Sequence, residues 1–85
     1  MSDTEKTEDL GRMSPAQVVQ CAEGSNAVCW IRAETTADDG TTTSYECCGG
    51  GGRKADFTVR TGILSAKSVD PHDVPDGLSW SRRCV

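Results

Sequence analysis

The sequence is poor in the residues that build a large hydrophobic core. Leu, Ile, Val and Phe supply 13 of the 85 residues, and the aromatic residues are two Trp, one Tyr and one Phe. A strongly apolar fraction below roughly 20% is typical of chains that do not fold. The net charge of −4 is moderate, however, and the composition is not that of a disordered tail. We therefore expect one small domain with a small core.

Other deficits argue against whole classes of function. Lys and Arg number 9 against 13 Asp and Glu, so we do not expect nucleic acid binding. No apolar run reaches the roughly 18 residues that cross a bilayer, so we expect no transmembrane segment. The opening stretch MSDTEKTEDL lacks the basic and apolar regions of a secretory signal, which predicts a cytoplasmic protein as the sequence is written. With a single histidine, we expect neither an enzyme nor a bound cofactor.

Helix boundary signals are complete in the segment MSPAQVVQCAEGS, which follows a polar stretch. Residues 1–12 are mostly acidic and polar, and they predict a disordered acidic tail. A single small domain then begins at 13. Ser14 can cap a helix, Pro15 suits its first position, and Gln17 completes a capping box. These signals predict a short amphipathic helix over about 15–23, which is too short to be stable unless it docks.

Two runs rich in β-branched and aromatic residues flank the turn formers ADDG and predict a β-hairpin over about 27–48. The loop length decides its register. A two-residue turn at 39–40 places Cys29 diagonal to Cys48. A four-residue loop over 37–40 pairs Thr36 with Thr41 and Cys29 with Cys48. The second register suits the side chains better, and it brings Cys29 and Cys48 close enough for a possible disulfide.

The second half of the chain predicts further strands. The glycines at 49–52 predict a flexible linker. The run ADFTVRTGILSAKSV alternates with period two, which predicts strand structure over about 55–69 with a bend at Gly62. LSWSRRCV predicts a last strand over about 78–85. The predicted fold is a small β-rich α+β domain over 13–85: one short N-terminal helix, then a hairpin and two or three further short strands.

The glycine run and the neighbouring cysteines could indicate a ligand site. A phosphate-binding loop needs a hydroxyl residue after its lysine, but Lys54 precedes Ala55, and a strand follows in place of a helix. Adjacent Cys47 and Cys48 point to opposite faces of a strand, whereas a zinc knuckle spaces its cysteines two residues apart. A small Cys-ligated metal-binding protein, with Cys47, Cys48 and His72 as candidate ligands, stays an alternative, although we expect no metal.

Apolar residues at Met13, Val18 and Ala22 precede the dipeptide Gly24–Ser25. This pattern resembles the double-glycine leader of exported bacterial peptides, including bacteriocins and microcins, over about the first third of the chain. Removal of residues 1–25 would leave Cys29, Cys47, Cys48 and Cys84, an even number that suits a disulfide framework. The resemblance implies an alternative function: the precursor of an exported, cysteine-containing peptide that is secreted after its leader, ending near Ser25, is removed.

The short docking helix and the small core favour a chain that is completed by a partner. Trp30, Tyr45 and Trp80 are the predicted partner contacts, because aromatic side chains carry much of the binding energy at interfaces. They could equally form the core. We predict a small non-enzymatic binding or accessory protein that acts through another protein.

Overall fold

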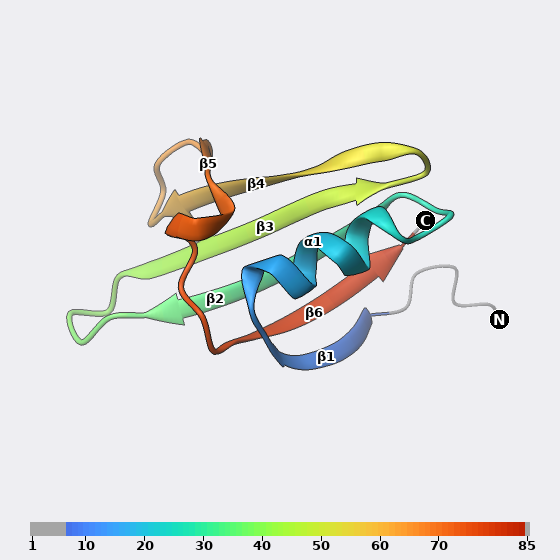
Figure 1. Cartoon of the computed structure of the whole chain (residues 1–85). Helices are drawn as coiled ribbons and strands as arrows, with labels where there is room; N and C mark the ends of the chain where they lie inside the picture. The colour runs from blue at the N-terminus through green and yellow to red at the C-terminus, as the bar shows by residue number, and fades with distance from the viewer. Residues whose placement is uncertain (1–6, 85) are drawn as a thin grey trace, which may run out of the picture.

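Residues 7–84 fold as one antiparallel β-sheet with an α-helix across one face (Figure 1). The structure is a computed structural model that describes residues 7–84. The six strands lie in the order β1-β6-β2-β3-β4-β5. The elements in chain order are β1 (Thr7–Met13), α1 (Pro15–Glu23), β2 (Cys29–Thr36), β3 (Thr42–Gly50), β4 (Arg53–Thr61), β5 (Lys67–Val69), the 3-10 helix η1 (Pro71–Asp73) and β6 (Leu78–Cys84).

The predicted fold with an N-terminal helix is wrong, because a strand precedes the helix. Residues 7–12 were expected in a disordered tail, yet they belong to β1, which pairs with β6 at the edge of the sheet. An edge strand needs few apolar residues, and here Leu10 and Met13 are the ones that pack against the core. The register shifts between Asp9 and Gly11, whose amide donates to the Asp9 carboxylate. The rest of the expected tail, residues 1–6, lies outside the described residues.

The helix itself is confirmed, and it covers the sheet. The Ser14 hydroxyl accepts a hydrogen bond from the Gln17 amide at 3.3 Å, and the Gln17 side chain accepts one from the Ser14 amide at 2.9 Å. Val18 and Ala22 are fully buried against the sheet. At nine residues α1 is too short to be stable in isolation, so its contacts with β2, β3 and β4 hold it in place.

The predicted hairpin exists, but its register is wrong by one residue. Thr36 pairs with Thr42 across a loop over 37–41, so Cys29 lies opposite Gly49. Hydrogen bonds inside the loop explain the longer connection: the Ala37 amide donates to the Thr41 carbonyl, and the Thr41 amide donates to the Asp39 carboxylate. The shift decides which side chain of β3 lies beside each side chain of β2.

The glycines at 49–52 are an ordered hairpin and not a linker. Gly49 and Gly50 end β3, and Gly50 pairs with Arg53 at the start of β4. Gly51 and Gly52 between them have φ of +63° and +86°, as a tight two-residue hairpin turn requires. A Cβ at Gly50 would lie 2.2 Å from the carbonyl oxygen of Ala27. The run of glycine therefore lets the chain after α1 approach the end of β3 closely.

The core lies between α1 and the sheet. It is a cluster of Val18, Ala22, Ile31, Ala33, Cys47, Phe57, Val74 and Trp80. The Trp80 and Phe57 rings meet edge to face with centroids 6.0 Å apart, and the Trp80 indole donates to the carbonyl of Met13 at 3.2 Å. Val74, just after η1, is also buried in this core.

The predicted strand region 55–69 is split by the turn at Gly62 into β4 and β5.

Candidate functional site

The face of the sheet opposite α1 carries side chains that alternate with the core residues. Within residues 7–84 these side chains are exposed or half-buried. They form rows across the strands because paired residues share a face. The rows are Arg83, Trp30, Cys48 and Asp56; then Ser81, Arg32, Glu46, Thr58 and Ser68; then Glu34, Ser44 and Arg60. We call this surface the open face.

Two neighbouring hollows lie on the open face. The larger, about 320 Å³, is lined by Thr7, Trp30, Arg32, Glu46, Arg60, Ser81, Arg82 and Arg83. The smaller, about 80 Å³, is lined by Arg32, Ser44, Glu46, Thr58, Arg60 and Ala66. They share Arg32, Glu46 and Arg60 in their linings, so they are neighbours, and together we call them the cross-strand groove. It runs across β6, β2, β3 and β4 to the β4–β5 loop.

Some charged side chains of the groove have ion-pair partners and others do not. Arg32 forms an ion pair with Glu34, which also accepts a hydrogen bond from the Ser44 hydroxyl at 3.4 Å. The side chains of Arg60 and Glu46 make no hydrogen bond or ion pair with any other described residue. The groove therefore presents one guanidinium and one carboxylate that are available to a ligand.

Arg82 lines the larger hollow, but its guanidinium is engaged elsewhere. It donates to the Glu8 carboxylate and, at 3.1 Å, to the thiol sulfur of Cys21. The hydrogen bond that Arg82 donates to Glu8 is the main reason that the pKa of Arg82 is raised. This contact ties β1 and the last turn of α1 to β6.

A pair of exposed apolar residues lies in the loop at one end of the groove. Ile63 is 102% exposed and Leu64 is 62% exposed, and both belong to the β4–β5 loop that contributes Ala66 to the lining. Adjacent large apolar side chains that are exposed to this degree are candidates for contact with another molecule.

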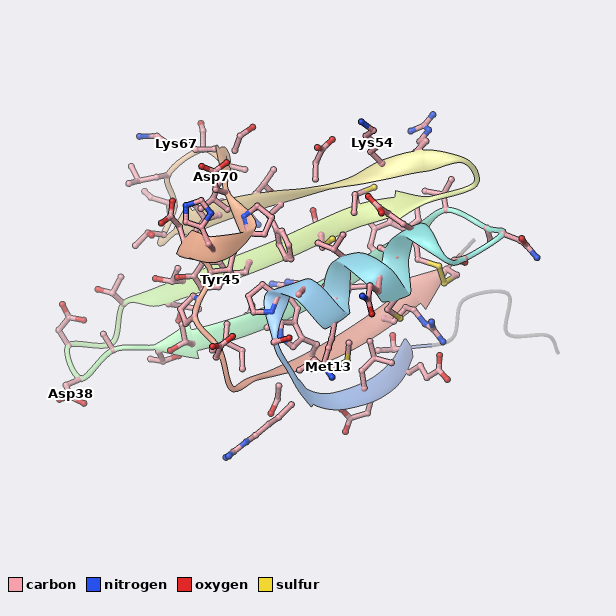
Figure 2. All side chains as sticks on the ribbon, in the orientation of Figure 1. Met13, Asp38, Tyr45, Lys54, Lys67 and Asp70 are labelled. Atoms are coloured by element: carbon pink, nitrogen blue, oxygen red, sulfur yellow. A yellow bond between two sulfur atoms is a disulfide. The ribbon has the colours of Figure 1, made fainter. Side chains whose placement is uncertain are left out.

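The predicted partner contacts are placed in three different environments. Trp30 is half-buried and lines the groove. Tyr45 lies in β3 on the side that α1 covers, where it packs against the core (Figure 2). Trp80 is only 1% exposed, so its assignment as a contact is wrong and it belongs to the core. Arg60, Arg32 and Glu46 were missed, although their alternation with apolar residues was visible in the sequence.

The predicted Cys29–Cys48 disulfide is wrong, because Cys29 is bonded to Cys84. These two cysteines are paired residues of β2 and β6, with Cα atoms 4.0 Å apart. The prediction failed because nothing local in the sequence indicates that β6 pairs with β2. Cys21, Cys47 and Cys48 are unbonded. Burial raises the pKa of the Cys47 thiol to about 12, whereas Cys48 lies half-buried on the open face.

The candidate metal ligands do not come together. Cys47 and Cys48 face opposite sides of β3, as adjacent strand residues do. Among residues 7–84, His72 instead clusters with Asp70 and Asp73, with one ligand atom of each within 4.8 Å of the others and all three exposed. Asp70 lies at the edge of the sheet that β5 forms (Figure 2). This exposed cluster contains none of the predicted cysteine ligands.

Comparison with known proteins supplies no relative. A scan of protein-family models, a search of curated proteins and a search of solved structures each found no match. In the described part of the chain, no helix is long and apolar enough to cross a membrane.

Proposed function

We propose that this protein is a small non-enzymatic binding or accessory protein that acts through a partner protein, with the cross-strand groove as its contact surface. The observation that carries the proposal is Trp30, a large aromatic side chain placed on the open face in a chain that has few such residues for its core. Tryptophan and arginine dominate the energetics of protein interfaces, and here both line one groove.

Rigid placement strengthens the case for Trp30. Its strand β2 is hydrogen-bonded to β6 on one side and β3 on the other, and the disulfide at Cys29 lies next to it in the chain. A side chain held this way loses little freedom on binding, which favours affinity. The adjacent apolar pair Ile63 and Leu64 adds contact area at the end of the groove.

Support for a non-enzymatic role comes from the distribution of reactive groups. The one histidine of the chain, His72, clusters with two carboxylates near η1 and lines neither hollow of the groove. Cys48, the unbonded cysteine on the open face, is paired across the strands with Trp30 and Asp56. A nucleophile with a base to activate it is therefore not assembled at this surface in residues 7–84.

The exported-peptide alternative is less favoured by the packing of residues 7–25. Val18 and Ala22 of α1 are fully buried against the sheet, and the Gly51 amide donates to the carbonyl of Ser25 at 3.1 Å. A leader that is removed without disturbing its product would make few such contacts. We therefore keep the partner-binding proposal first.

Affinity capture with matched variants tests the proposal. Tagged wild-type protein, Trp30→Ser and a control, Gln20→Ala on the exposed side of α1, are expressed in the native host after their melting temperatures are shown to agree within a few degrees. A specific partner is expected with the wild type and the control, and is expected to be depleted at least tenfold with Trp30→Ser. Equal recovery of every captured protein by all three would refute the groove as the contact surface.

A further inference from the structure

We propose that the cross-strand groove binds an extended segment of a partner protein in which carboxylates stand beside large apolar side chains. This inference rests on the proposed function and adds the chemistry of the partner. The inference follows from three features of the groove: the charges of its lining, the apolar residues at one end of the groove, and the length of the groove.

Arginine is concentrated in the lining of the groove, although the chain as a whole is acidic. The protein has a net charge of −4, yet the larger hollow is lined by four arginines against one carboxylate, Glu46. Arg32 and Arg82 are already paired with Glu34 and Glu8. Arg60 has no partner among residues 7–84, and a guanidinium is the side chain best shaped to bind a carboxylate through two parallel hydrogen bonds. A carboxylate of the partner is the ligand that Arg60 lacks.

The same surface argues against nucleic acid as the ligand. A nucleic acid needs a track of cationic side chains that neutralises several phosphates. On the open face, Glu34, Glu46 and Asp56 are interspersed with the arginines, so the cationic side chains form no continuous track. A protein segment with a few carboxylates, spaced by other residues, fits this mixed surface better.

Apolar side chains complete the recognition surface. Trp30 lines the middle of the open face, and the exposed Ile63 and Leu64 lie in the loop that bounds the groove beyond β4. Their burial requires apolar side chains on the partner, since contact with polar groups alone would leave those groups without hydrogen bonds. The ligand is therefore both acidic and apolar.

The groove sets the length of the segment. It reaches from Thr7 of β1 across β6, β2, β3 and β4, and four intervals of about 4.8 Å between neighbouring strands give about 19 Å. An extended chain that advances about 3.3 Å per residue covers this distance with about six or seven residues. A synthetic peptide of eight residues is therefore long enough to fill the groove.

A pair of isosteric peptides tests the inference on the full-length, oxidised protein. The acidic peptide is acetyl-Glu-Leu-Asp-Leu-Glu-Phe-Asp-Leu-amide, and its neutral counterpart replaces each Glu by Gln and each Asp by Asn. Both lack tryptophan, so protein fluorescence reports on Trp30, while Trp80 stays buried. We expect the acidic peptide to saturate the signal with Kd below about 1 mM and the neutral peptide to bind at least tenfold more weakly.

Two charge-reversal variants at exposed arginines of β4 provide the matched comparison. Arg60→Glu is expected to weaken the acidic peptide at least tenfold, whereas Arg53→Glu, which changes the net charge equally outside the groove lining, is expected to change its Kd less than twofold. Trp30→Ser removes the fluorescent reporter, so its affinity for the acidic peptide is measured by calorimetry and is expected to fall at least tenfold. Melting temperatures of the variants establish that each is folded.

Each contrary result has a distinct meaning. Equal affinity for the acidic and neutral peptides, with loss of binding in Trp30→Ser, would overturn the acidic inference and leave the groove as a protein-binding surface. Equal weakening by Arg53→Glu and Arg60→Glu would also overturn it, because the effect would then be one of net charge. Tighter binding of a twelve-residue oligothymidylate, lost in Arg60→Glu, would assign the surface to nucleic acid. No binding of the acidic peptide at 5 mM would refute the inference, while the capture experiment decides the proposed function separately.

Discussion

Removal of the Cys29–Cys84 disulfide should lower the free energy of unfolding by about 4 kcal/mol. The bond joins residues 55 positions apart in the sequence. Closing a loop of that length in the unfolded chain costs about 14 cal/mol/K of entropy, which at 25 °C gives about 4 kcal/mol. In the chain-entropy account, this loss arises in the unfolded chain, which the bond no longer restricts.

A loss of this size is large for a chain of 85 residues. Domains of this length are stable by roughly 4–13 kcal/mol in total. The expected fall in melting temperature is about 16–32 °C, at roughly 4–8 °C per kcal/mol. Urea denaturation should also become steeper on reduction, because the unfolded chain without its crosslink exposes more surface.

The assay is urea and thermal unfolding of the wild type with and without reductant, followed by fluorescence and near-UV circular dichroism. The double variant Cys29→Ala/Cys84→Ala should have nearly the same free energy of unfolding as the reduced protein. The change in packing at the two alanines should add only a smaller difference. Cys48→Ser is the control, since Cys48 is unbonded, and it should keep the full response to reductant. Alkylation of the denatured protein should label three cysteines before reduction and five after it.

Two results would refute this reasoning. Labelling of all five cysteines without reductant would mean that the bond is not formed in the purified protein. A loss below about 1 kcal/mol with the bond demonstrably present would mean that the unfolded chain is already compact, so that the crosslink restricts it little.

Two further predictions concern the core side of the sheet. Gly50→Ala should destabilise by about 3 kcal/mol or more in urea denaturation, because its Cβ would lie 2.2 Å from the Ala27 carbonyl oxygen and its φ is +103°. Gly52→Ala, also at positive φ but with no atom within 4 Å of the new Cβ, should cost only about 1–2 kcal/mol, and equal losses would contradict the close approach at Gly50. Burial raises the pKa of Cys47 from 9.0 to about 12, so its contribution to stability is complete below pH 9 and is lost as the pH rises toward 12. The free energy of unfolding should therefore fall more steeply above pH 9 in the wild type than in Cys47→Ala, and parallel curves would contradict this account.

The parts of the fold that could be predicted are those with local signals. Ser14, Pro15 and Gln17 lie within four residues and fix the start of α1 by themselves. Period-two alternation likewise indicated β4 and β6. The position of β6 in the sheet has no such signal, since it lies between β1 and β2 and pairs with residues near the other end of the chain. The disulfide was missed for this reason, whereas β1 was missed because its residues are mostly polar, as an edge strand allows.

The open face could have been found from the sequence by a stricter test of the hairpin register. The predicted pairing of Cys29 with Cys48 also pairs Ile31 with Glu46, which would bury a carboxylate beside a core residue at a cost of several kcal/mol. The observed register pairs Ile31 with Cys47 and leaves Glu46 beside Arg32 on the other face. The predicted register favours a disulfide over the burial pattern. A shift of the hairpin register by one residue, however, changes every cross-strand neighbour along both strands. When Ile31 and Ala33 are required to face apolar partners, Trp30 and Arg32 are placed together on the open face, and the site follows from the register.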